Sequence, residues 1–137
     1  MTDLATIERV LAYSRWAVVG CSDNPWRSSH SVAEFLIERG YDVVPVNQQI
    51  TEVFGRPCYP SLAAIPKPVD VVDLFRRSEY VAAHVEEAIA AGAKAVWTQL
   101  GVIDEAAAAR AHAAGLDVVM NRCPARELPL LRARRSA

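Results

Sequence analysis

The apolar run at residues 16–20 ends in Gly20. A loop of small and polar residues follows, and then a helical pattern over residues 31–39 that Gly40 closes. A second short apolar run, residues 41–46, comes directly after that helix. Two strands separated by one helix form a βαβ unit, in which the strands are parallel and the crossover is right-handed. This unit limits the fold to a sheet whose faces are covered by helices.

The rest of the chain continues the alternation of strands and helices. The further strands are predicted at residues 69–75, 95–98 and 116–120, and the helices between and after them at residues 78–89, 104–115 and 126–134. The last helix is weakly predicted because prolines interrupt its pattern. The alternation predicts an α/β fold of the Rossmann-like, doubly wound type, with a mainly parallel five-stranded sheet and helices on both faces.

Two other features complete the predicted organisation. Residues 4–11 form an amphipathic opening helix, capped by Thr2 or Asp3, which we expect to pack across the edge of the sheet. Residues 52–62 contain one glycine and two prolines, which rule out a regular central strand and predict an irregular or edge segment. A short helical turn is predicted at residues 61–65, and Ser78 is predicted to cap the helix that follows the third strand.

Composition narrows the class of protein. With 137 residues, of which 15 are basic and 16 acidic, the chain fits a single domain spanning residues 1–137. The net charge near zero gives no electrostatic reason to expect nucleic acid or an anionic membrane as partner. Three cysteines without zinc-type spacing predict neither a disulfide framework nor a metal site, and they fit a reducing compartment. With neither a signal-peptide pattern nor an apolar run of about 20 residues, the expected location is the cytoplasm.

The loop after Gly20 carries hydroxyl groups and a guanidinium, at Ser22, Arg27, Ser28 and Ser29. A strand, a tight turn and a helix in this order direct backbone N–H groups and the positive end of the helix dipole toward an anion. We expect these amides to be left unpaired by the protein so that they can hold a phosphate-bearing cofactor. Arg76, on another loop, offers a second guanidinium for a separate phosphate group.

The sequence does not match two common phosphate-binding motifs. The dinucleotide fingerprint needs three glycines after the first strand and an acidic residue at the end of the second. Here Gly20 stands alone and Asn47 closes the second strand, so the pattern favours NAD(P) only weakly. The sequence also contains no Walker loop, GxxxxGK[ST].

Several separated segments together resemble the coenzyme A-binding domain proteins, single-domain relatives of the amino-terminal domain of the succinyl-CoA synthetase α subunit. The matching segments are VVGCSDNPWRSSHSV, VPVN, GRPCYPSLAAIP, VDVVDLFRR, GAKAVWTQLGV and GLDVVMNRC. They agree in order and spacing over about residues 12–125. Cys21 stands where many members have alanine, and Gln48 where many have proline.

The resemblance implies which residues meet the coenzyme. In the family the first loop holds the phosphates, the end of the second strand meets the adenosine, and the ends of the third and fourth strands line the remaining crevice. Carried over, the expected cofactor-binding residues are Gly20, Cys21, Ser22, Asp23, Asn24, Arg27, Ser28, Val46, Asn47, Gln48, Phe75, Arg76, Trp97, Thr98 and Gln99. Trp97 is either a ligand contact or a core residue, because it lies within a predicted strand.

The resulting hypothesis is a module that binds coenzyme A or an acyl-CoA without a reaction of its own. No nucleophile, base and orienting residue can be assembled from the strand-end positions, so no catalytic residue is assigned. The larger synthetase carries its phosphorylated histidine on a second domain, so ligase activity of this chain alone is not expected. The alternatives are an NAD(P)- or nucleotide-dependent enzyme, and a regulatory subunit that lends its coenzyme site to a separate catalytic chain. A protein partner or a homo-oligomer stays open.

Two cysteines have alternative interpretations. Cys21 lies in the phosphate loop, where the helix N-terminus and Arg27 could favour its thiolate, and Cys123 follows the fifth strand beside Arg122. The first interpretation is that both pack as small hydrophobic residues. The alternative hypothesis is that one of them forms a mixed disulfide with the coenzyme thiol. His84 and His112 are interpreted as structural residues of helices, and His30 as a residue beside the phosphate loop.

Overall fold

The computed structural model describes residues 3–136, in which a five-stranded sheet has the strand order β2-β1-β5-β6-β7. The strands are β1 (Arg15–Val19), β2 (Asp42–Val46), β5 (Val71–Leu74), β6 (Ala95–Thr98) and β7 (Asp117–Val119). All neighbouring pairs run parallel. The predicted five strands are therefore confirmed, with ends that differ by one or two residues from the predicted ranges.

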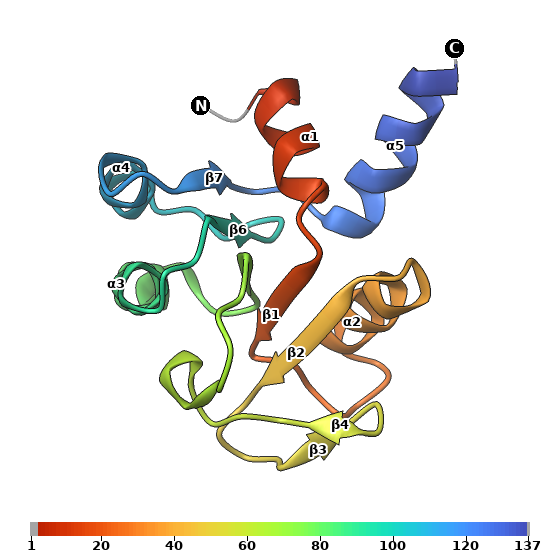
Figure 1. Cartoon of the computed structure of the whole chain (residues 1–137), viewed down its shortest axis with the longest axis vertical. Helices are drawn as coiled ribbons and strands as arrows, with labels where there is room; N and C mark the ends of the chain where they lie inside the picture. The colour runs from red at the N-terminus through yellow and green to blue at the C-terminus, as the bar shows by residue number, and fades with distance from the viewer. Residues whose placement is uncertain (1–2, 137) are drawn as a thin grey trace.

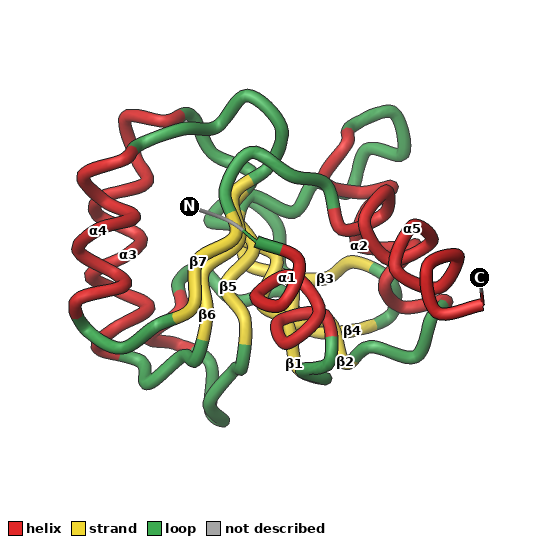
Figure 2. Tube along the Cα trace, turned by 90° about the horizontal axis from the view of Figure 1, so that it is seen from above, coloured by secondary structure: helices red, strands yellow, loops and turns green. Residues whose placement is uncertain are grey.

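Helices cover both faces of this sheet, as Figures 1 and 2 show. One face is covered by α1 (Leu4–Leu11), α2 (Ser28–Glu38) and α5 (Pro124–Ser136), and the other by α3 (Val81–Ala90) and α4 (Glu105–Ala113). Each face has its own apolar core, one around Trp16 and Trp97 and the other around Leu74 and Val96. The fold is thus the predicted Rossmann-like, doubly wound α/β fold.

The strand order places the topological switch point of the sheet between β1 and β5. From β1 the chain turns outward to β2, and it then returns to β5 on the opposite side of β1. Loops leaving the carboxyl ends of β1 and β5 therefore part in opposite directions. In open α/β sheets, ligands bind outside the carboxyl ends of the strands at such a switch point.

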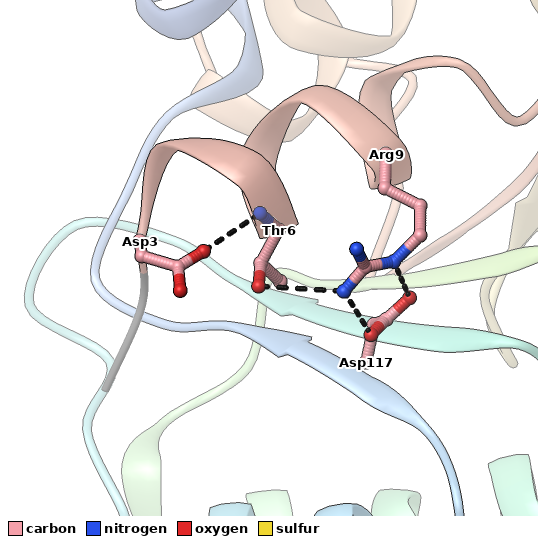
Figure 3. A network of polar contacts seen from close by, with 4 residues as sticks. All are labelled: Asp3, Thr6, Arg9 and Asp117. Carbon is pink, nitrogen blue, oxygen red and sulfur yellow. Dashed lines mark hydrogen bonds and ion pairs between the residues drawn. The ribbon is translucent and has the colours of Figure 1, made fainter.

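The opening helix packs on the edge strand β7, as predicted. Asp3 caps α1 by accepting a hydrogen bond of 2.8 Å from the Thr6 backbone N–H, whereas Thr2 lies outside the described residues. Arg9 reaches from α1 to β7 and donates to both carboxylate oxygens of Asp117, at 2.9 and 2.8 Å (Figure 3). This bidentate pair fixes the helix on the edge strand.

Residues 52–62 lie outside the main sheet, as their glycine and prolines predict. They form a small antiparallel hairpin of β3 (Glu52–Val53) and β4 (Arg56–Pro57), followed by the short 3-10 helix η1 (Leu62–Ala64). Phe54 and Gly55 at its tip have φ angles of 58° and 69°. The hairpin lies beside the end of β2, where Val46 forms an isolated bridge with Tyr59 (Figure 1).

Several helix ends differ from the predictions. The second helix begins at Ser28 rather than at residue 31, and α5 runs through Pro129 to Ser136 rather than ending at residue 134. The prediction that Ser78 caps the next helix is wrong. Residues 78–80 form a separate 3-10 turn, η2 (Ser78–Tyr80), and the Ser78 hydroxyl oxygen instead accepts a hydrogen bond of 2.9 Å from the Ile103 backbone N–H.

None of the helices between residues 3 and 136 has the length and apolar character needed to cross a membrane.

Candidate functional site

The backbone that follows β1 passes close to the backbone that follows β5. Gly20, directly after β1, has a φ angle of +84° and donates a hydrogen bond of 2.8 Å to the Val46 carbonyl. A Cβ atom on Gly20 would lie 2.5 Å from the Phe75 carbonyl oxygen. Only glycine satisfies both this backbone conformation and this approach. Gly20 therefore sets the shape of the switch point.

A pocket of about 290 Å³, called here the polar pocket, opens at this point. It is lined by Val19, Gly20, Arg27, Val46, Asn47, Gln48, Gln49, Pro60, Ser61, Leu62, Phe75, Arg76, His84 and Glu87. These residues come from the ends of three adjacent strands, from the start of α2, from the segment before and within η1, and from α3. The pocket brings together seven of the predicted site residues: Gly20, Arg27, Val46, Asn47, Gln48, Phe75 and Arg76.

Two guanidinium groups from different elements line the polar pocket. Arg27 precedes the first turn of α2, and Arg76 follows β5 with its guanidinium 4.4 Å from the centre of the Tyr80 ring. The single carboxylate among the lining residues, that of Glu87, is engaged by His84, whose Nδ1 lies 2.5 Å from Glu87 Oε1. Because guanidinium groups form strong, often bidentate hydrogen bonds with phosphate oxygens, the pocket is suited to an anionic ligand.

The expectation that the amides of the loop after Gly20 are unpaired is wrong for most of them. The backbone N–H groups of Ser22, Asn24 and Trp26 each donate a hydrogen bond of 3.0 Å to a side chain of the same segment, respectively Ser29 Oγ, Ser22 Oγ and Asn24 Oδ1. The hydroxyls that suggested ligand contacts thus shape the loop itself. Short polar side chains commonly satisfy nearby backbone groups in this way.

The amides that stay available are that of Asp23 in the loop and those at the start of α2. Within the described residues 3–136, the backbone N–H groups of Asp23, Ser28 and Ser29 make no hydrogen bond to the protein. No side chain caps α2, whose N-cap residue is Arg27. The positive end of the helix dipole therefore lies next to the pocket-lining Arg27, so the groups suited to an anion are mainly a helix N-terminus and guanidinium groups rather than a cradle of loop amides.

The Asn47 side chain forms hydrogen bonds with the loop after β1 and with the loop after β2. Its Nδ2 donates to the Cys21 carbonyl at 2.8 Å, and its Oδ1 accepts from the Gln49 backbone N–H at 2.8 Å. Both polar groups of the side chain are thus already hydrogen-bonded within the protein. Asn47 lines the pocket and holds its shape at the same time.

The predicted residues at the end of β6 lie outside the polar pocket. Trp97 is fully buried in the core against Trp16, and its Nε1 donates to the Arg122 carbonyl at 2.8 Å. Thr98 donates to the Val102 carbonyl at 2.7 Å, and Gln99 donates to Asp73 Oδ1 at 2.5 Å. The remaining predicted residues belong to the loop after Gly20 and to the start of α2, but they do not line the pocket: Cys21, Ser22, Asp23, Asn24 and Ser28.

Sequence reasoning missed seven of the lining residues: Val19, Gln49, Pro60, Ser61, Leu62, His84 and Glu87. Three of these, Pro60, Ser61 and Leu62, lie in the segment GRPCYPSLAAIP, which carries part of the family resemblance but contains none of the expected site residues. His84 and Glu87 are spaced by three residues on α3, so they share one helix face. That spacing was the available signal for both.

Cys21 packs as a small core residue, the first of its two interpretations, and the alternative of a favoured thiolate is wrong. The Cys21 side chain is fully buried, and burial raises the pKa of its thiol to about 12, with smaller contributions from neighbouring Cys58 and Asp73. Arg27 is exposed and does not offset this cost. At neutral pH Cys21 is therefore a protonated core residue, and a mixed disulfide through it is not supported.

Alkylation of the folded protein with iodoacetamide is expected to modify Cys123 and to leave Cys21 and Cys58 unmodified. Cys123 is partly exposed, whereas the other two are buried, and burial raises the pKa of both buried thiols. Peptide mapping by mass spectrometry would measure the modified fraction at each site. The denatured protein, in which all three thiols react, is the control; modification of Cys21 as fast as of Cys123 would contradict the assignment.

Among residues 3–136, no group of three or more His, Cys, Asp or Glu side chains is placed to hold a metal ion.

Comparison with known proteins places the chain among coenzyme A-related sequences. A family model described as "CoA binding domain" matches residues 14–129. The uncharacterized protein YneT of Bacillus subtilis is 39% identical over 120 residues, which are 87% of this chain and 89% of that protein. The structure of cell-free ID.343 from Thermus thermophilus has a TM-score of 0.88 and 32% sequence identity, and the match covers 95% of this chain and 99% of that one.

A longer protein shares part of the same sequence. The ADP-forming acetate–CoA ligase I of Archaeoglobus fulgidus is 31% identical over 81 residues. The match covers 59% of this chain but only 12% of the ligase.

Proposed function

The chain belongs to the family of CoA-binding domains, and from that premise we propose that it binds coenzyme A or an acyl form of it in the polar pocket. The observation that carries the proposal is the convergence of Arg27 and Arg76 on a pocket at the switch point of the sheet. Coenzyme A carries a diphosphate and a ribose 3′-phosphate, so two guanidinium groups on separate elements suit separate phosphates.

The other lining groups take complementary roles in this proposal. The free amides at the start of α2 contribute to the phosphate site through the helix dipole. Asn47 and Gln48, at the end of β2, lie where the family meets the adenosine, and Phe75 offers a partly buried apolar surface to the ligand. Gly20 allows the ligand to approach the backbone closely.

We propose a binding or regulatory module in the cytoplasm rather than an enzyme. Among residues 3–136, no Ser, Thr or Cys side chain is hydrogen-bonded to a histidine side chain, so no activated nucleophile is assembled. The matched part of the acetate–CoA ligase is a small fraction of that protein, so its reaction is not proposed for this chain. A separate catalytic chain that borrows the coenzyme site is the partner that fits this role.

Arg76→Ala and Arg27→Ala are each expected to weaken coenzyme A binding roughly ten- to hundredfold, because each removes a charge-assisted hydrogen bond to a phosphate. Isothermal titration calorimetry of the wild-type protein and both variants measures the effect. Arg77→Ala is the matched control, because Arg77 is adjacent and exposed but does not line the pocket. It is expected to change the affinity less than threefold, roughly the effect of a screened surface charge.

The same titration with NAD⁺ and NADP⁺ tests the alternative ligand class. Tighter binding of either dinucleotide than of coenzyme A would overturn the proposal, as would equal losses of affinity in Arg76→Ala and Arg77→Ala. Mass spectrometry of small molecules that remain bound after purification provides an independent check of the ligand.

A further inference from the structure

A second cavity adjoins the polar pocket on the α3 side of the sheet. This apolar groove, of about 440 Å³, lies between residues 62–69 and α3. Its walls are mainly aliphatic, from Leu62, Ile65, Pro66, Val69 and Ala90. In Figure 1 the yellow-green segment that contains η1 runs near α3, and the two elements are in contact.

The sequence explains why this space is left open. Pro66 and Pro68 have no backbone N–H, so the segment before β5 neither extends η1 nor adds a strand to the sheet. On the facing side of the groove α3 presents Ala90 and Ala91, whose small side chains do not fill the gap. The groove is therefore a consequence of residue choice on both of its walls.

The groove and the polar pocket meet. Leu62 and Glu87 line both cavities, so the two spaces adjoin at these residues. Glu87 is held at this junction by His84, through the contact of 2.5 Å described above. An acyl-coenzyme A whose phosphates lie near Arg27 and Arg76 brings its acyl chain into the groove only if its pantetheine arm crosses this junction.

We propose that the apolar groove accepts the acyl chain of an acyl-coenzyme A whose phosphates occupy the polar pocket. The inference rests on the proposed function and adds a ligand class to it, namely medium-chain fatty acyl thioesters. An alkyl chain gains from burial against aliphatic walls. A purine suits the groove poorly, since among the lining residues only Lys67 and Glu87 have charged or polar side chains to satisfy its ring nitrogens.

Affinity is expected to rise with acyl chain length. Titration of the wild-type protein with coenzyme A, acetyl-CoA, butyryl-CoA, hexanoyl-CoA and octanoyl-CoA should give at least a roughly tenfold gain from acetyl to octanoyl, because each buried methylene adds to the binding free energy. Ala90→Phe places a large side chain in the groove. It is expected to abolish the gain with length and to leave the affinity for coenzyme A itself within about twofold of wild type.

Ala83→Phe is the matched control. Ala83 is exposed on the same helix and lines neither the groove nor the pocket, so this variant should keep the full dependence on chain length. Thermal melting of both variants verifies that each is folded at the temperature of the titration.

The outcomes separate this inference from the proposed function. Binding of coenzyme A with an affinity that does not change with acyl length overturns the groove assignment alone. An equal loss of affinity for coenzyme A and octanoyl-CoA in Ala90→Phe also overturns it, because the groove would then hold the nucleotide end. If neither coenzyme A nor octanoyl-CoA binds the wild-type protein, both proposals fail.

Discussion

Gly20→Ala is expected to lower the free energy of unfolding by at least about 3 kcal/mol. The φ angle of +84° at Gly20 disfavours any residue with a Cβ, and the added Cβ would lie 2.5 Å from the Phe75 carbonyl oxygen. That oxygen belongs to the backbone at the end of a central strand, so it cannot rotate away as a side chain would. Relief of the clash requires β1 and β5 to move apart at their carboxyl ends, next to the polar pocket. Urea denaturation of the wild type and the variant measures the loss.

Gly40→Ala separates the clash from the backbone strain. Gly40 has a similar φ angle of +91°, but nothing lies within 4 Å of the position of its added Cβ. The expected loss is therefore the conformational cost alone, about 1–2 kcal/mol. Equal losses at the two positions would show that the close approach of the Phe75 carbonyl oxygen does not affect stability. They would contradict the conclusion that this approach requires glycine at position 20.

The fold could be predicted from the sequence because the residue patterns that mark its strands and helices are local. Each central strand is a short apolar run with a boundary that the sequence marks, and the helices between them show the spacing of one buried face. Where the prediction failed, a tertiary contact decided the outcome. Ser78 has the residue type and position of a helix cap, but its hydroxyl oxygen accepts from Ile103, which lies 25 residues away along the chain.

The candidate site was predictable to a smaller extent, for two physical reasons. Hydroxyl-rich loops satisfy either a ligand or their own amides, and only coordinates show that Ser22 and Ser29 do the latter. A strand buried on both faces also gives no alternation, so the sequence did not indicate whether Trp97 points into the core or toward the crevice. Whether His84 faces the polar pocket depends on how α3 is rotated against the sheet, and no local sequence pattern determines that rotation.

Asp73 is a buried carboxyl group that the proposed binding role does not use. It lies in β5 between Val18 of β1 and Trp97 of β6, and its side chain is fully buried. Gln99 Nε2 donates to Oδ1 at 2.5 Å, but within residues 3–136 Oδ2 is buried without a hydrogen-bond partner. Desolvation raises the pKa of this carboxyl to about 8, and the hydrogen bond from Gln99 offsets only part of that effect. Asp73 is therefore protonated in the folded protein at neutral pH.

Because Asp73 is protonated in the folded protein, its contribution to the free energy of unfolding decreases as the pH rises. In the unfolded chain Asp73 ionises near pH 4, so between about pH 4 and pH 8 the folded state binds the extra proton. The contribution of Asp73 to the free energy of unfolding is then greatest below pH 4 and falls by about 1.4 kcal/mol per pH unit until about pH 8. Above that pH both states are ionised, and the contribution no longer changes.

Asp73→Asn is expected to remove this slope. Asparagine keeps the shape and an oxygen that accepts from Gln99, but it does not ionise, so the variant should gain about 4 kcal/mol relative to wild type between pH 5 and pH 8. Asp117→Asn is the control with the opposite sign. Arg9 lowers the pKa of Asp117, so its stabilisation is present above the ordinary pKa of aspartate and is lost only as the pH falls through the lowered value. Denaturation curves at several pH values should therefore show a changing difference for Asp73→Asn and a constant one for Asp117→Asn. A constant difference for Asp73→Asn would mean that the carboxyl is already ionised in the folded protein, with a partner for its second oxygen.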